Sequence, residues 1–124
     1  MDDELKRAVI PKLRAAGFKG SFPHFRRVAP SSIDLLTFQF DKYGGGFVVE
    51  IARCPSEGFT TSWGKYIPPN KVTAFDLYER KRIQATRGSG LDKWFRFDDG
   101  NYESAANQVI ARLPEAEEYW KSRP

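Results

Sequence analysis

The fold is decided by residues 24–54, HFRRVAPSSIDLLTFQFDKYGGGFVVEIARC. Residues 33–40 and 47–54 are rich in the β-branched and aromatic side chains that are typical of strands. The glycine-rich stretch 41–46 separates them, and a shorter segment, 24–28, comes before a turn of Ala, Pro and Ser residues. Because connections this short join antiparallel strands, the sequence predicts a three-stranded antiparallel meander.

The lengths of the two turns set the register of this meander. If Val28 pairs with Ile33 and Phe40 pairs with Phe47, all three strands align, and their side chains alternate between the two faces of the sheet. One face then collects Phe25, Leu36, Phe38, Phe40, Phe47, Val49 and Ile51. We expect this face to form the core and to be covered by helices.

The opposite face of the meander is mixed, and its polar members gather together. His24, Thr37 and Glu50 share one row across the three strands, and Arg26 lies next along. Such a row is typical of the solvent-facing side of an antiparallel sheet, and it is also a candidate binding surface. The candidate binding residues on this face are His24, Arg26, Thr37, Gln39 and Glu50.

Three charged residues line up across the strands at one end of the core face. They are Arg27, Asp34 and Arg53, and Asp34 lies between the two arginines, where it can pair with both. We interpret this set as a structural ion-pair cluster at the rim of the core.

Helices are predicted at both ends of the chain. Apolar side chains repeat every three to four residues over 2–16, Gly17 stands where a helix-ending glycine belongs, and Pro11 is expected to kink the last turns. Residues 98–101, Asp-Asp-Gly-Asn, offer capping side chains for a C-terminal helix. There Pro114 is expected to begin a second helical segment, residues 115–122.

These elements predict the architecture of the whole chain. Further short strands are expected within residues 72–86, which end at the turn 87–90, and within residues 93–97. We therefore expect residues 1–124 to form one α+β domain. It has a single antiparallel sheet of about five strands, with the N- and C-terminal helices packed on one face.

Residues 55–71 predict a long loop, because they contain glycines and prolines and few apolar repeats. Loops of this length in a small domain are often functional. Trp63 and the other aromatic residues of this loop are of the kinds that interface cores favour, so the loop is a candidate protein-contact element. The alternative is that it folds back and caps the core.

Composition excludes several classes of protein. The 124 residues are 40% hydrophobic and 29% charged, as in ordinary globular domains. The single cysteine excludes an intramolecular disulfide, and the single histidine excludes a two-histidine metal site. No apolar stretch approaches the ~18 residues of a membrane span, and the charged N-terminus is unlike a signal peptide. We expect a cytoplasmic protein with no metal, cofactor or membrane segment.

The sequence offers few pairs of side chains that could act together in catalysis. His24 and Cys54 fall on strands that are two apart, so about 9.6 Å separates the strand axes, which is beyond the reach of a nucleophile and its base. Thr37 lies between His24 and Glu50, which separates an imidazole from the carboxylate that would orient it. The sequence therefore gives little support for an enzyme, and Cys54 is interpreted as a small buried side chain.

Arginines and aromatic residues interleave in residues 80–82 and 94–97, together with Arg87, which is one signal of nucleic-acid binding. Strand alternation divides these side chains between two faces of the sheet. Arg82 faces away from Lys81, and Trp94 faces away from Phe95. Arg82 and Trp94 are kept as candidate binding residues. The net charge of +4 is also uneven, since residues 98–124 carry 6 acidic and 3 basic side chains. Nucleic acid is therefore not the favoured partner.

Several short motifs, in this order and spacing, resemble a bacterial family, the domain of unknown function numbered four-three-zero-four. The motifs are Leu5, Leu13, Gly17-Phe18-Lys19, Phe25-Arg26-Arg27, Phe38-Gln39, Phe47-Val48-Val49, Arg82-Ile83 and Asp92-Lys93-Trp94-Phe95. The similarity spans roughly residues 5–100, with a looser helical tail. It implies a small cytoplasmic α+β domain and brings no catalytic residue or cofactor. Four residues occupy positions of the family motifs, and the resemblance assigns them no function: Arg26, Arg27, Arg82 and Trp94.

Three functional hypotheses follow. The leading one is a non-enzymatic interaction domain that binds a protein partner through the exposed sheet face and the loop 55–71. Small bacterial domains of this kind sometimes serve as immunity partners of secreted toxins, which is an analogy at the level of the fold. The second is weak binding of nucleic acid or another polyanion. The third is a small-molecule or hydrolytic site around His24, Arg26 and Glu50. The sequence leaves the oligomeric state open.

Overall fold

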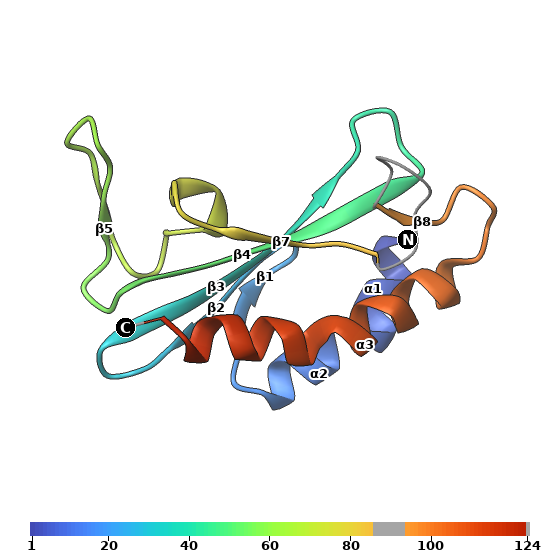
Figure 1. Ribbon diagram of the computed structural model, residues 1–124, viewed down its shortest axis with the longest axis horizontal. Coiled ribbons are helices and arrows are strands. Elements are labelled where there is room, and N and C mark those ends of the chain that lie inside the picture. The colour runs from blue at the N-terminus through green and yellow to red at the C-terminus, as the bar shows by residue number, and fades with distance from the viewer. Residues whose placement is uncertain (86–93, 124) are drawn as a thin grey trace.

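The structure is a computed structural model that describes residues 1–85 and 94–123. A sheet forms its central layer. The helices α1 (Asp2–Ala8), α2 (Ile10–Ala15) and α3 (Tyr102–Lys121) lie on one side of the sheet, and a 3₁₀ turn, η1 (Ala74–Asp76), lies on the other (Figure 1). The predicted α+β class, with an antiparallel sheet and terminal helices on one face, is confirmed.

Within the described residues the main sheet has six strands in the order β1-β2-β3-β4-β7, and β8 also pairs with β4. All of these pairs are antiparallel. Val28 pairs with Ile33, and Phe40 pairs with Phe47, so the register expected from the turn lengths is confirmed. The strands are β1 (Lys19–Ser21), β2 (His24–Val28), β3 (Ser32–Phe40), β4 (Gly46–Pro55), β7 (Lys81–Ile83) and β8 (Phe95–Arg96).

The strands at the edges of the sheet differ from the prediction. β1 was not expected, because its Lys-Gly-Ser sequence lacks strand-forming side chains. Gly20 allows it to form: its φ is +119°, and a Cβ there would lie 2.6 Å from the carbonyl oxygen of His24. β7 is the strand expected within 72–86, and it occupies residues 81–83 of that stretch. The turn 87–90, Arg87 and the start of the segment 93–97 lie outside the described residues.

The N-terminal helix is divided in two at Val9, where a kink was expected. Pro11 lies in the first turn of α2, where its missing N–H group has no intrahelical partner to lose. Gly17 ends α2 as predicted, with a φ of +99°. The amide of Phe18 donates to the carbonyl oxygen of Leu13 at 3.0 Å, which satisfies one of the last carbonyls of the helix.

The C-terminal helix is continuous, so the prediction of a second segment beginning at Pro114 was wrong. Asn101 caps its start, and the side chain accepts a hydrogen bond from the amide of Ser104 at 3.1 Å. Pro114 costs the helix one hydrogen bond. The helix continues because Val109 before the proline and Trp120 after it are both buried against the sheet.

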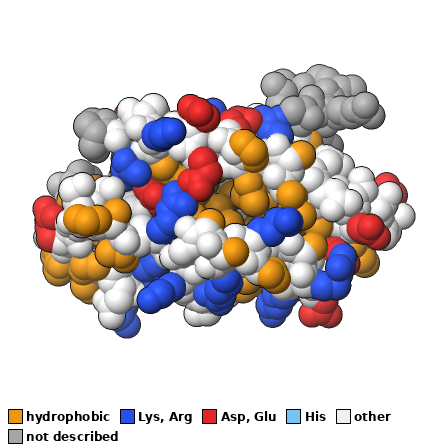
Figure 2. All heavy atoms as spheres, turned by 90° about the horizontal axis from the view of Figure 1, so that it is seen from below, with side chains coloured by type: hydrophobic (Ala, Val, Ile, Leu, Met, Phe, Trp, Pro, Cys, Tyr) orange, Lys and Arg blue, Asp and Glu red, His pale blue; other side chains and the backbone are white. Residues whose placement is uncertain are grey.

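The helix-side core is formed as predicted by one face of the central strands. Phe25, Leu36, Phe38, Phe47, Val49 and Ile51 are buried in it, and Phe40 packs at its margin. All three helices contribute to it. Seen from the helix side, the surface carries interspersed basic and acidic side chains around hydrophobic ones (Figure 2).

The reverse face of the sheet is not the solvent-facing surface that was expected. Its apolar residues Ile33, Leu35, Ala52 and Cys54 are buried. They are covered by Ile67 and by residues 68–77, which we call the strap and which include η1. Val72, Ala74 and Leu77 of the strap complete this second, smaller core, which we call the reverse core. The sheet is therefore covered on both sides over part of its area.

The loop 55–71 contains a hairpin that the sequence did not reveal. Its strands are β5 (Phe59–Thr60) and β6 (Tyr66–Ile67), and they form a separate two-stranded sheet. The hairpin extends away from the main sheet (Figure 1). Its base packs on the reverse core through Ile67 and Phe59, whereas Trp63 near its tip is 77% exposed.

Candidate functional site

The predicted polar row exists, and it extends one strand further than expected. His24 of β2 pairs with Thr37 of β3, Thr37 pairs with Glu50 of β4, and Glu50 pairs with Arg82 of β7. The row therefore crosses four adjacent strands. Arg82, which the sequence offered as a separate candidate, belongs to the same group as the other three.

Glu50 is the charged centre of this row. Its side chain is only 3% exposed. Nε of Arg82 donates to Oε1 of Glu50 at 2.9 Å, and Nε of Arg80 lies 3.8 Å from Oε2. A buried carboxylate requires such partners. Because two guanidinium groups share one carboxylate, the group carries a net positive charge. Arg82 also lies over the ring of Trp94, with 5.5 Å from its guanidinium carbon to the ring centroid.

His24 is held in place by Thr37 and Phe75. Its Nδ1 lies 2.9 Å from Oγ1 of Thr37, and its ring meets Phe75 edge-on with 5.7 Å between centroids. Burial and then the positive charge of Arg26 lower the pKa of His24 below its ordinary value of 6.5. The imidazole is therefore uncharged at neutral pH.

The row lacks the geometry of a hydrolytic site. Thr37 is fully buried, so its hydroxyl group cannot reach a substrate in this conformation. Glu50 is engaged by arginines and lies on the far side of Thr37 from His24. Cys54 is buried as well, and burial raises the pKa of its thiol to about 11. These groups stabilise the sheet and position its arginines.

Two arginines attach the strap to the sheet. Arg26 of β2 donates through Nη2 to the carbonyl oxygen of Val72 at 2.8 Å. Arg80, just before β7, donates through Nη1 to the carbonyl oxygen of Phe75 at 3.2 Å. Each arginine gives a hydrogen bond to a carbonyl group of the strap. Arg26 was predicted as a binding residue, and the structure gives it this structural contact.

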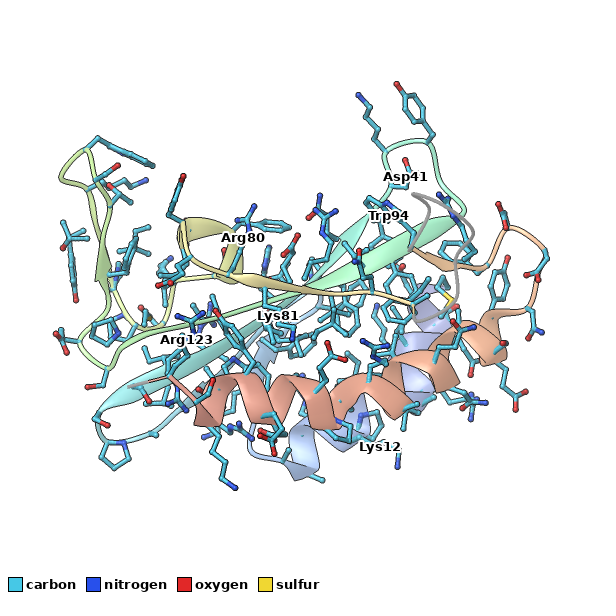
Figure 3. All side chains as sticks on the ribbon, viewed as in Figure 1. Lys12, Asp41, Arg80, Lys81, Trp94 and Arg123 are labelled. Atoms are coloured by element: carbon cyan, nitrogen blue, oxygen red, sulfur yellow. The ribbon has the colours of Figure 1, made fainter. Side chains whose placement is uncertain are left out.

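An open groove of about 700 Å³ lies between the hairpin β5–β6 and the strap. Four aromatic side chains line it: Phe59, Trp63, Phe75 and Tyr78. Tyr78 is fully exposed, and Arg80 lies at the edge of the groove over the ring of Phe75 (Figure 3). We call this feature the aromatic groove. Trp63 could be predicted from its loop, whereas Phe75 and Tyr78 could not, because nothing local indicates that residues 75–78 return beside the hairpin.

The predicted ion-pair cluster is present on the helix side of the sheet. Arg27 donates to Oδ2 of Asp34 at 2.8 Å, and Arg53 donates to Oδ1 at 2.7 Å. Glu117 of α3 also accepts from Arg27 at 2.5 Å. The cluster therefore fastens α3 to the rim of the core, which the spacing of the three strand residues did not reveal.

The remaining candidates are spread over different surfaces. Arg80 and Arg82 share Glu50, whereas Lys81 points to the helix side and pairs with Glu115, as strand alternation predicts (Figure 3). Gln39 is half-buried at the far end of β3 from the strap. Trp94 lies beside Arg82, and it is well separated from Arg80 at the edge of the aromatic groove (Figure 3).

Residues 1–85 and 94–123 hold no group of three or more side chains suited to a metal ion. Within the same residues, no helix has the length and apolar character needed to cross a membrane.

These observations define an α+β domain with a helix-covered antiparallel sheet, a strap across its reverse face and an aromatic groove beside the strap. Residues 9–123 match the family described as "Domain of unknown function (DUF4304)", so the chain belongs to this family. The match confirms the resemblance carried by the short motifs and extends it over α3. Curated proteins and solved structures gave no match.

Proposed function

We propose that this chain is a non-enzymatic protein-interaction module of the bacterial cytoplasm that binds its partner in the aromatic groove. The observation that supports the proposal is that exposed aromatic side chains gather around the aromatic groove. Trp63 is 77% exposed and Tyr78 is fully exposed, although both side chains are large and partly apolar. Aromatic side chains that cluster at the surface around a groove are typical of protein interfaces.

The occupant that fits best is an extended segment of a protein carrying apolar and acidic side chains. The outer edges of the β5–β6 sheet are unpaired within the described residues, and such edges accept a further strand. Arg80 is the basic residue that lines the groove, and the carboxylate of Asp76 accepts from the amide of Thr73 at 2.8 Å and forms no ion pair with Arg80. A carboxylate on the partner complements this charge.

This proposal keeps the loop 55–71 as a contact element and replaces the sheet face that the sequence suggested. The reverse face of the sheet is largely covered by the strap, so the proposed contact surface consists of the hairpin, the strap, Tyr78 and Arg80. An immunity role, in which the partner is a secreted toxin, is the form of this proposal that the fold-level analogy supports. A toxin gene beside this gene in the genome would favour that form over others.

The test is affinity capture from the native host, with the captured proteins identified by mass spectrometry. The groove variant carries Trp63→Ser and Tyr78→Ser, and the matched control is Tyr43→Ser, which removes an equally exposed aromatic side chain from a different hairpin. We expect a stoichiometric partner that the wild type and the Tyr43 variant retain and the groove variant loses. Recovery of nucleic acid in place of a protein, or equal capture by all three chains, would contradict the proposal.

A further inference from the structure

A second pocket, of about 390 Å³, opens at the outer edge of the sheet beside the start of the strap. It is lined by Gly17, Lys19, Arg26, Val28, Pro69 and Asn70. Lys19 of β1 and Arg26 of β2 are directly paired in the sheet, so their side chains lie on the same face. Two positive charges thus meet at the wall of one pocket.

No carboxylate of the described chain neutralises these two charges. Neither Lys19 nor Arg26 forms an ion pair within residues 1–85 and 94–123, although the arginines of the polar row and of the ion-pair cluster all do. Like charges placed opposite each other on neighbouring strands repel. An anion between them would remove this repulsion.

The guanidinium of Arg26 is already oriented for such an anion. Its Nε and Nη2 both donate to the carbonyl oxygen of Val72, at 3.3 and 2.8 Å. These bonds fix the plane of the group and leave Nη1 without an acceptor in the described part of the chain. A donor held in place before binding loses little conformational freedom when its ligand arrives.

The other walls of the pocket indicate which kind of anionic ligand fits. Val28 is 63% exposed at the entrance, and Pro69 adds a second apolar surface. Asn70 offers a neutral amide. Two cations and an apolar wall suit one carboxylate on an apolar body better than a phosphate, which requires more donors.

We propose that this pocket binds a carboxylate carried on an apolar body, with Lys19 and Arg26 as the ion-pair partners and Val28 and Pro69 in contact with the body. The ligand is either a free small acid or an acidic side chain of another protein, and the chemistry is the same in both cases. The proposal stands independently of the aromatic groove, because it needs no protein partner.

The test is an NMR titration of the purified, ¹⁵N-labelled chain with sodium butyrate, with sodium acetate, 1-butanol and inorganic phosphate as comparisons. We expect saturable shifts at the amides of Gly17, Lys19 and Asn70 with butyrate, weaker binding of acetate and no binding of butanol. Shifts that do not saturate, or shifts spread evenly over the surface, would overturn the site. Tighter binding of phosphate than of butyrate at these amides would overturn the choice of ligand.

Two variants and a control sharpen this test. Lys19→Gln is expected to weaken butyrate binding about threefold to tenfold, as the loss of one partly exposed ion pair does. Val28→Asp, which places a carboxylate at the entrance, is expected to abolish it. Lys12→Gln removes an exposed lysine of α2 and should leave binding unchanged. Equal effects of Lys19→Gln and Lys12→Gln would contradict the assignment.

The two sources of the carboxylate are separated with a peptide, acetyl-Ala-Glu-Ala-amide. Saturable shifts at the same amides with this peptide support an acidic side chain of a protein. Binding of butyrate but not of the peptide supports a free acid, because the pocket then excludes a peptide backbone.

Discussion

Arg26 and Val72 are 46 residues apart in the sequence, yet Nη2 of Arg26 lies 2.8 Å from the carbonyl oxygen of Val72. Arg80 makes a similar contact three residues further along the strap, where its Nη1 lies 3.2 Å from the carbonyl oxygen of Phe75. Two guanidinium groups thus hold the middle of the strap, next to Ala74 of the reverse core. The strap contributes residues to the aromatic groove and to the pocket beside Lys19 and Arg26.

Removing one attachment should loosen the strap. Arg26→Met keeps the length of the side chain and removes its donors, and we expect it to lower the free energy of unfolding by about 1–2 kcal/mol. Amide hydrogen exchange over residues 72–77 should accelerate more than exchange in α3. Lys71→Met, which changes an exposed neighbour, is the control. Equal exchange of the strap in both variants would show that Arg26 does not hold it.

The ion-pair cluster should contribute strongly to stability, because its carboxylate is buried. Asp34→Asn removes the buried negative charge that Arg27 and Arg53 share and places an amide NH2 donor against a guanidinium group, so we expect the free energy of unfolding measured with urea to fall by an amount on the order of 3 kcal/mol. Glu118→Gln, at an exposed position of α3, should change stability by less than about 0.5 kcal/mol. A loss below about 1 kcal/mol for Asp34→Asn would mean that water already solvates the cluster.

His24 should make stability depend on pH. Burial and the charge of Arg26 lower its pKa in the folded chain, so the unfolded chain binds the proton more tightly. Neutral His24 therefore contributes its full share to the free energy of unfolding above about pH 6.5. This contribution falls as the pH drops through that value toward the pKa of the folded chain. Urea unfolding at about pH 7.5 and about pH 5.5 measures this difference, and His24→Gln should reduce it.

The titration of His24 can also be followed directly, since it is the only histidine of the chain. Its imidazole Cε1–H resonance gives the folded pKa by NMR without assignment of other residues. A value at or above 6.5 would contradict the environment described for His24.

The thiol of Cys54 should be unreactive in the folded chain. It is buried, and burial raises its pKa to about 11, so little thiolate is present near pH 8. Labelling with a thiol-reactive disulfide reagent at that pH should be slow in buffer and fast in concentrated urea. Fast labelling of the folded chain would show that the reverse core opens readily, since the strap covers this residue.

Two tryptophans provide a matched comparison of buried and exposed rings. The indole Nε1 of Trp120 donates to the carbonyl oxygen of Ala52 at 2.9 Å, and the ring is buried. Trp120→Phe removes that bond and leaves a void, so we expect a loss of about 2 kcal/mol in urea unfolding. Trp63→Phe should change stability by less than about 0.5 kcal/mol. Similar losses for both would contradict the packing of α3 on the sheet.

The central sheet could be predicted because its information is local. Two short turns determine which residues pair, and alternation then assigns every side chain of three strands to a face. The row of His24, Thr37 and Glu50 and the alignment of Asp34 with two arginines followed from these turns alone. Arg27 also contacts Glu117, which lies 90 residues later, and no local pattern indicates that contact.

The strap could not be predicted, because it is stabilised by distant contacts. Val72, Ala74 and Leu77 follow neither a helical nor a strand period, and they are buried only because Leu35 and Ala52 lie beneath them. Phe75 and Tyr78 therefore gave no signal as parts of a groove with Trp63. The helix break predicted at Pro114 was wrong for a similar reason. The packing of α3 against the sheet outweighs the local cost of a proline.

The reverse core has a consequence for how this domain changes over evolution. Residues 56–80 supply the hairpin, the strap and the walls of the aromatic groove, and they contribute Ile67, Val72, Ala74 and Leu77 to the reverse core. The helices and the ion-pair cluster stabilise the sheet from its other side. Under the proposed function, substitutions at the groove-lining positions of this one stretch would change what the groove binds, while the helix-side core, which contains none of these residues, stays the same.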